Sequence, residues 1–156
     1  MIDDLFCAVD FLHNQNIVHR DIKPDNILMK NSPDLSWALC DFGLAVDQNC
    51  EHIELGAAGT EKFLPPEVIQ KKLPHSTAAD IWSCGTTMLK TLKNKYPSQE
   101  NEYTKCVSLP VDINLILTCC FQLNPNKRRS AKDILQIRDK HSKKKFILVD
   151  ESNSNF

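Results

Sequence analysis

The sequence predicts a mainly α-helical domain with one or two small β-hairpins. Apolar residues recur at helical spacing in several separate stretches, and two short apolar runs flank a turn-forming segment. The chain has 156 residues, 42% of them hydrophobic and 25% charged, which is ordinary globular usage and suits a single domain. We therefore expect one compact domain over residues 1–140, followed by a polar, basic tail over 141–156.

The helical stretches differ in how their apolar residues are distributed. The first helix begins at the first residue and presents one apolar stripe, formed by Ile2, Leu5, Val9 and Leu12. A second stretch has apolar or small residues on several sides and is expected to be buried; it contains Ile81, Gly85, Met88, Leu89 and Leu92. A third contains Ile113, Ile116, Leu117, Cys120 and Phe121.

Local signals place the remaining elements. Ser130 and Asp133 resemble the capping box that opens a last helix. The sequence predicts two strands joined by a turn, at Ile27–Met29 and Trp37–Cys40. The segment from Leu44 to Pro66 has no usable periodicity, so we expect a long loop, and loops of this length are usually functional.

Charge and cysteine content exclude several classes of protein. Nineteen basic and twenty acidic residues leave a net charge of −1, which argues against direct nucleic-acid binding. The seven cysteines form no CxxC pair, so neither a disulfide framework nor a zinc ribbon is expected, and Cys50 with His52 is too isolated for a metal site. No apolar run approaches the roughly 18 residues of a membrane span, and we expect an intracellular protein without membrane contact.

Two motifs carry the chemistry. Residues 19–26 read HRDIKPDN, and Asp41-Phe42-Gly43 begins fifteen residues after Asn26. In this order they resemble the catalytic loop and the metal-binding motif of protein kinases. The resemblance continues through Gly59-Thr60, Pro65-Pro66-Glu67, the run 80–85 (DIWSCG) and the run 124–128 (NPNKR). It implies a kinase-like C-terminal lobe over residues 1–140.

The resemblance implies a role for each matched polar residue. Asp21 would be the catalytic base, and Lys23 would place an ammonium near the transferring phosphate. Thr60 would hydrogen-bond near Asp21 and Lys23. Asn26 and Asp41 would be the magnesium ligands and, with Lys23, would bind ATP.

Further matched residues have supporting roles. Leu28 would pack under the adenine ring, and Phe42 would pack beneath His19. Asp80 would hold the catalytic-loop backbone, Glu67 would pair with Arg128, and Trp82 is expected in the core.

Substrate class and activation follow from two more residues. Lys23 in HRDxK is similar to serine/threonine rather than tyrosine kinases, so we expect a protein Ser/Thr substrate. Arg20 precedes Asp21, an arrangement that often needs a phosphorylated activation loop, yet residues 44–58 contain no Ser, Thr or Tyr. We hypothesise that Glu54 or a bound partner stands in for phosphate; the alternative is a solvated acidic loop containing Asp47, Glu51 and Glu54.

Within the family, several runs are similar to the cell-division-control kinase that fires replication origins. They are residues 37–45, 58–60, 66–68 and 76–80, with Tyr96-Pro97. This similarity implies a regulatory subunit, a role in cell-cycle and DNA-replication control, and a location in the nucleus or the cytoplasm.

No segment resembles the Gly-rich loop, the strand lysine or the helix glutamate of a kinase N-terminal lobe. We therefore expect the lower lobe alone, with an exposed apolar surface around Leu28 and Phe42, and poor autonomous catalysis. Two functions are expected on this basis. One is a serine/threonine kinase, either completed by a partner or represented by an incomplete gene model; the other is a pseudokinase that acts as a binding module.

Overall fold

The computed structural model describes residues 1–30, 36–50, 58–97 and 109–140. The helices are α1 (Ile2–Asn14), α2 (Pro66–Ile69), α3 (Thr77–Lys93) and α4 (Val111–Cys120), with a further helix over residues 131–140. Single 3₁₀ turns are η1 (Pro24–Asn26), η2 (Glu61–Phe63) and η4 (Pro125–Lys127). The strands are β1 (Ile17–Val18), β2 (Ile27–Met29), β3 (Trp37–Leu39) and β4 (Val46–Asp47).

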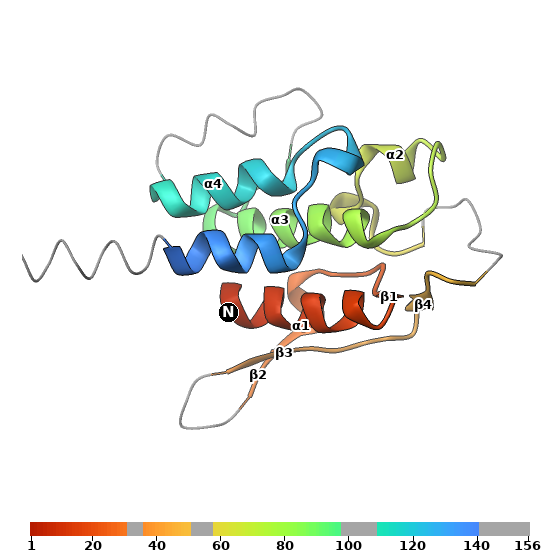
Figure 1. The fold of residues 1–156 in the computed structure, drawn as a ribbon, viewed down its shortest axis with the longest axis horizontal. Coiled ribbons are helices and arrows are strands. Elements are labelled where there is room, and N and C mark those ends of the chain that lie inside the picture. The colour runs from red at the N-terminus through yellow and green to blue at the C-terminus, as the bar shows by residue number, and fades with distance from the viewer. Residues whose placement is uncertain (31–35, 51–57, 98–108, 141–156) are drawn as a thin grey trace, which may run out of the picture.

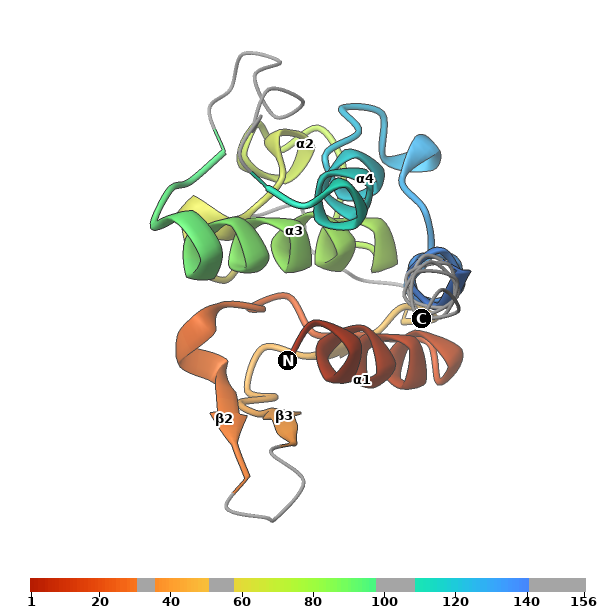
Figure 2. The same cartoon turned by 90° about the vertical axis from the view of Figure 1, so that its left-hand side faces the viewer.

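The helix α3 lies at the centre of the molecule. α1 packs on one side of it, and α2 and α4 lie on the other, with the β2–β3 hairpin beyond α1 (Figures 1 and 2). Every residue from Ala79 to Leu89 is buried, as the apolar and small residues of this stretch predicted. Leu92 differs from the prediction: it is 42% exposed, because the buried run ends before the last turn of α3.

The close approach of α3 and α4 depends on Gly85. A Cβ at this position would lie 2.6 Å from the Cβ of Cys120, so only glycine lets the two helices meet at this distance. Around this contact, Phe121 packs edge-on against Trp82 with ring centroids 5.1 Å apart. The core expected from the third helical stretch is confirmed, since Ile113, Ile116, Leu117, Cys120 and Phe121 are all buried.

The first helix and the last cap also agree with the sequence predictions. α1 begins at Ile2, one residue after the predicted start, and Leu5, Val9 and Leu12 of its stripe are buried while Ile2 is partly buried. The Ser130 hydroxyl accepts a hydrogen bond from the Asp133 amide at 3.1 Å, which is the capping contact expected at the start of helix 131–140. The predicted tail over 141–156 lies outside the described residues.

Two small antiparallel sheets position the loops. β2 pairs with β3 in the register Ile27 with Leu39, Leu28 with Ala38 and Met29 with Trp37. The strands match the two predicted ones, except that β3 ends at Leu39; their connecting turn lies outside the described residues. The region 44–66, predicted as loop, contains β4, which pairs with β1, and the turn η2. These elements have two or three residues, too few to produce a periodic pattern.

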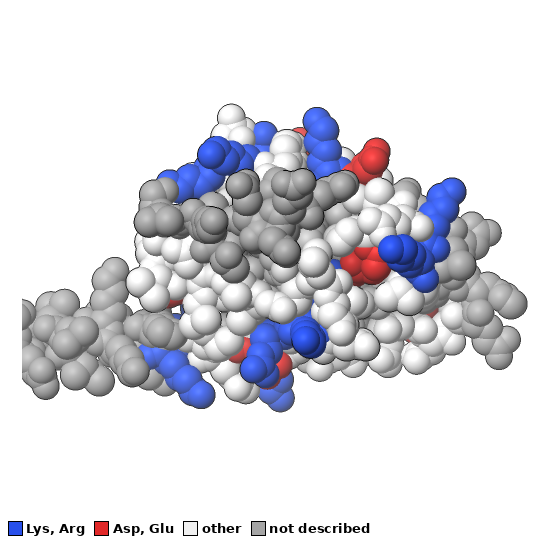
Figure 3. All heavy atoms as spheres, turned by 90° about the horizontal axis from the view of Figure 1, so that it is seen from above, with Lys and Arg blue, Asp and Glu red and all other residues white. Residues whose placement is uncertain are grey.

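Charged side chains are dispersed on the face above α4. Figure 3 shows Lys and Arg there in several separate groups with uncharged surface between them. Among the described residues, no helix is both long and apolar enough to cross a membrane.

Candidate active site

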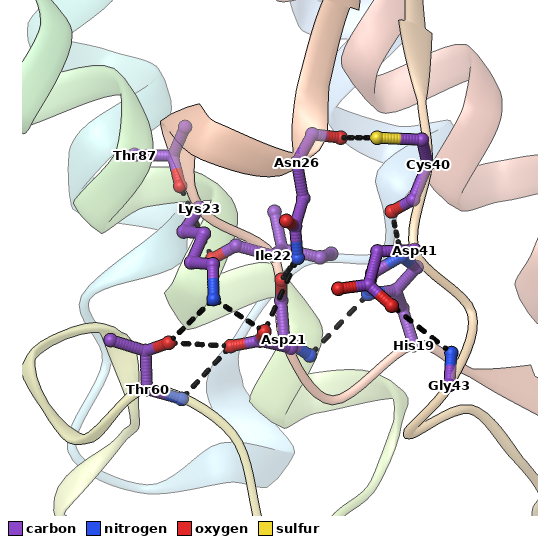
Figure 4. A network of polar contacts seen from close by, with 10 residues as sticks. All are labelled: His19, Asp21, Ile22, Lys23, Asn26, Cys40, Asp41, Gly43, Thr60 and Thr87. Carbon is purple, nitrogen blue, oxygen red and sulfur yellow. Dashed lines mark hydrogen bonds and ion pairs between the residues drawn. The ribbon is translucent and has the colours of Figure 1, made fainter.

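Asp21 is the centre of a compact polar network. Its carboxylate accepts hydrogen bonds from Lys23 Nζ at 2.7 Å, Thr60 Oγ1 at 2.8 Å and the Thr60 amide at 2.9 Å (Figure 4). Lys23 Nζ also donates to Thr60 Oγ1 at 2.9 Å, which closes the triangle. The Asn26 amide nitrogen donates to the Asp21 carbonyl at 2.8 Å and to its carboxylate at 3.2 Å. Four residues from positions 21 to 60 therefore meet at one point.

The approach of Thr60 to Asp21 requires the glycine that precedes it. Gly59 has φ of +98°, and a Cβ there would lie 2.2 Å from the carbonyl oxygen of Arg20. Any side chain would push the segment away from the catalytic loop, so Gly59 sets the contact between Thr60 and Asp21. Arg20 and Asp41 themselves have positive φ values, 70° and 63°. Such conformations cost on the order of 1–3 kcal/mol each and persist where the surroundings hold them.

The buried carboxylate of Asp80 holds the catalytic loop in place. One oxygen accepts the His19 amide at 2.8 Å and the other accepts the Arg20 amide at 3.0 Å, as the sequence comparison predicted. His13 Nε2 lies 3.1 Å from the same carboxylate. This third contact was not predicted. His13 and Asp80 are 67 residues apart, and no local pattern in the sequence pairs a histidine in the last turn of a helix with so distant a carboxylate.

Asn26 and Asp41 offer oxygen atoms suited to magnesium. Asn26 uses its amide nitrogen for Asp21, which leaves its Oδ1 as an acceptor. Asp41 uses one carboxylate oxygen to accept the Gly43 amide at 3.3 Å, and Figure 4 shows its other oxygen on the side of the site that faces Asn26 and Asp21. Two oxygen ligands fit a cation that keeps several waters and binds phosphate oxygens. The described residues contain no group of three or more His, Cys, Asp or Glu that could hold a metal by themselves.

The metal-binding motif is coupled to the catalytic loop through an aromatic contact. Phe42 packs edge-on against His19 with centroids 5.1 Å apart, as expected. His19 Nε2 lies 3.1 Å from the Cys40 carbonyl, and its Nδ1 accepts the Asp21 amide at 3.4 Å, so the proton is on Nε2. Leu28 is on β2, where its side chain is 54% exposed.

The network changes the acid–base properties of its members. Burial raises the pKa of Asp21, but the hydrogen bonds from Lys23 and Thr60 outweigh it, and the pKa is lower than the ordinary value. The hydrogen bond to Asp21 raises the pKa of Lys23 against the effect of burial, and the charges of Asp21, Asp25 and Asp41 add to the rise. Asp21 is therefore ionised and Lys23 protonated near neutral pH.

A second ion pair lies beneath the site. Arg128 donates to both Glu67 oxygens, at 2.6 and 2.8 Å, and also to the Ala78 carbonyl at 3.0 Å. The guanidinium carbon lies 4.9 Å from the centre of the Trp82 ring. Both the predicted pair and the predicted core position of Trp82 are confirmed.

This lobe-like helical fold, with an Asp–Lys–Thr–Asn network beside an exposed Asp-Phe-Gly turn, defines the class of protein. Residues 1–138 match the model of the protein kinase domain. The chain belongs to the protein kinase domain family.

Curated relatives of this chain are serine/threonine kinases. A probable serine/threonine-protein kinase, mkcD, of Dictyostelium discoideum is 32% identical over 85% of this chain and 22% of its own length. The kinase SRK2I of Arabidopsis thaliana is 30% identical over 83% of the chain and 41% of its own length. CBL-interacting protein kinase 2 of Oryza sativa is 31% identical over 85% of the chain and 33% of its own length. The chain thus spans less than half the length of each of these relatives. None of the three bears the name of a replication-origin kinase.

Proposed function

We propose that the protein transfers the terminal phosphate of ATP to serine or threonine residues of protein substrates. The Asp21 network is the observation that supports this function best. A hydroxyl nucleophile needs a carboxylate to accept or orient its proton, and Asp21 is ionised and fixed by three donors.

Lys23 and Thr60 define the place of the substrate hydroxyl. The ammonium of Lys23 stabilises negative charge on the transferring phosphate, since it is held within 2.7 Å of Asp21 and cannot move far from the reacting atoms. The Thr60 hydroxyl occupies the position beside Asp21, so a substrate serine must approach from the side that Thr60 leaves open.

Asn26 and Asp41 are the proposed magnesium ligands. When bound, magnesium neutralises charge on the phosphates. Asn26 is kept in position by its two hydrogen bonds to Asp21, and Phe42 on His19 sets the location of the motif that contains Asp41. Leu28, on the adjacent strand, is proposed to contact the adenine ring.

The test is phosphate transfer from ATP to a serine peptide, with and without a candidate regulatory subunit. We expect transfer by the wild type and a loss of at least about 10²-fold in Asp21→Asn, which keeps the shape but cannot accept the proton. Lys72→Gln, an exposed substitution away from the network, serves as the matched control. Equal signal from the wild type and Asp21→Asn would refute the kinase function.

The exposed apolar surface favours a second candidate, a non-catalytic module that binds a kinase or its regulator. Leu28 and Met29, which lie on β2 after Asn26, are 54% and 59% exposed, and Phe42, which packs against His19, is 49% exposed. Phosphate transfer measured with the partner bound separates the two candidates: a chain that binds a partner but gives no Asp21-dependent transfer is a binding module.

We also propose that the protein is similar in role to the replication-origin kinase. It is supported by the sequence runs around Asp41, Thr60 and Asp80. Complex formation with the regulatory subunit of that kinase would test it directly.

A further inference from the structure

A polar groove of about 530 Å³ lies between the last turn of α1, the first turn of α3 and the segment from η4 into helix 131–140. Figure 2 places η1, beside the Asp21 network, and helix 131–140 on opposite sides of the molecule. The groove is therefore separate from the phosphate-transfer site. We propose that it binds a phosphorylated segment of a protein partner, with Arg129 and Lys132 contacting the phosphate.

The groove has positive charge without a protein counterion. Arg129 and Lys132 line it, and among the described residues neither has a carboxylate within 4.0 Å. Arg128 also lines the groove, but Glu67 neutralises it. Asp10 is the carboxylate of the lining, so two unpaired cations face one anion.

The position of these cations is unfavourable in the free protein. Arg129 precedes helix 131–140 and Lys132 lies in its first turn, where the helix dipole produces positive potential and acidic residues are preferred. A dianionic phosphate would remove this repulsion. The arginine guanidinium can donate two parallel hydrogen bonds to phosphate oxygens, and the lysine can supply a third.

The other polar residues favour a peptide over a free ion. Amide side chains line the groove at Asn14, Asn16, Gln48 and Asn126. Each can donate to a carbonyl and accept from an amide, as an extended peptide backbone requires. The groove is also several times larger than one phosphate group, which leaves room for the residues on either side of it.

The test titrates the ¹⁵N-labelled chain, at constant ionic strength, with a peptide mixture that has a fixed central phosphoserine and degenerate flanks. The same mixture with serine and inorganic phosphate are the comparison ligands. We expect saturable shifts at residues 13–16 and 126–132 with the phosphopeptides, and at least about ten-fold weaker binding by Arg129→Gln/Lys132→Gln. Lys72→Gln should bind as the wild type does.

Stability provides an independent readout. Because the two cations repel the helix start, the double variant should melt at the same temperature as the wild type or higher in the absence of ligand. Asn126→Ala, which keeps both cations, should weaken the phosphopeptide but not inorganic phosphate.

Several outcomes would overturn the proposal. They are undiminished binding by the double variant, equal affinity for the serine mixture, or shifts confined to residues 21–26 and 60. Inorganic phosphate that binds as tightly as the phosphopeptides would refute the peptide assignment. Because no readout uses phosphate transfer, failure here is distinguishable from failure of the kinase function.

Discussion

At the scale of single residues, the site depends on how Lys23 and Asp21 set each other's protonation. Lys23→Gln removes an ammonium 2.7 Å from the carboxylate while burial continues to raise the carboxyl pKa. We expect the pKa of Asp21 to rise in this variant, and ¹³C carboxyl titration by NMR measures it. Lys30→Gln, another lysine-to-glutamine change, should leave the titration unchanged. An unaltered Asp21 titration in Lys23→Gln would contradict the network.

The lowered pKa of Asp21 also makes the stability of the fold depend on pH. The folded-state pKa of Asp21 is below its unfolded value of about 3.9, so its contribution is complete above that pH and is lost as pH falls through the folded-state pKa. In Lys23→Gln the two values move closer together. The acid-induced loss of stability below pH ~4 should therefore be smaller in that variant.

His75 gives a second pH dependence, of a group that folding keeps neutral. It is 2% exposed, and burial lowers its pKa, assisted by the charge of Arg20; Asp80, Glu67 and the Ala58 backbone oppose the shift. Its folded pKa is thus below the unfolded value of about 6.5, so stability falls as pH falls below that value. His75→Gln cannot titrate, and its stability should change less between pH 7 and 5.

Denaturant unfolding at a series of pH values measures the effect of His75. Lys72→Gln, at an exposed position, is the control and should preserve the wild-type slope. If the unfolding free energy of His75→Gln changes with pH as much as that of the wild type, the pKa of His75 does not differ between the folded and unfolded states, and the prediction is wrong.

At the scale of elements, the pair Glu67–Arg128 joins α2 to the turn η4. Arg128→Met leaves the buried Glu67 carboxylate without its counterion, which costs about 3–5 kcal/mol of unfolding free energy. Chemical denaturation measures the loss. Adding Glu67→Gln should recover part of it, while Arg129→Met, an exposed neighbour, should not destabilise. A loss below ~1 kcal/mol in Arg128→Met would contradict the structural role of the pair.

Arg20 is a cation for which the sequence predicts an acidic partner in the loop over residues 44–58. Among the described residues, the Arg20 guanidinium has no carboxylate partner within 4.0 Å; its Nε donates to the Leu44 carbonyl. We expect Glu54, which lies outside the described residues, to supply the charge that phosphate supplies elsewhere. Glu54→Gln should lower phosphate transfer to a serine peptide, with Glu51→Gln as control. Unchanged transfer would remove the hypothesis.

The elements also show what the sequence could predict. α1, α3 and α4 were predictable because ten or more residues share one burial pattern, and the Asp21 network was predictable because its residues follow a family motif. β4 and η2 were not, since two or three residues carry no period. The burial of His75 and the contact from His13 to Asp80 depend on packing between elements, which no local pattern records.

At the scale of the whole molecule, β2 carries two neighbouring exposed apolar side chains, Leu28 and Met29. Leu28 and Met29 are already more than half exposed, so Leu28→Gln/Met29→Gln should leave the melting temperature within a few degrees of the wild type. The same change should reduce self-association, which sedimentation velocity measures. Phe11→Gln, on α1, removes an exposed apolar residue outside this surface and should reduce self-association less. Equal association by all three proteins would contradict a role for this surface.

The carboxylate of Asp80 has a consequence that extends across the molecule. Its oxygens bind the backbone on both sides of the bond between His19 and Arg20, and they also meet His13, whose ring lines the groove on the far side. A molecule seated against His13 would touch a side chain that contacts Asp80, and Asp80 in turn binds the backbone amide of Arg20, the residue before Asp21. A single buried side chain, Asp80, therefore joins this groove to the loop that contains Asp21.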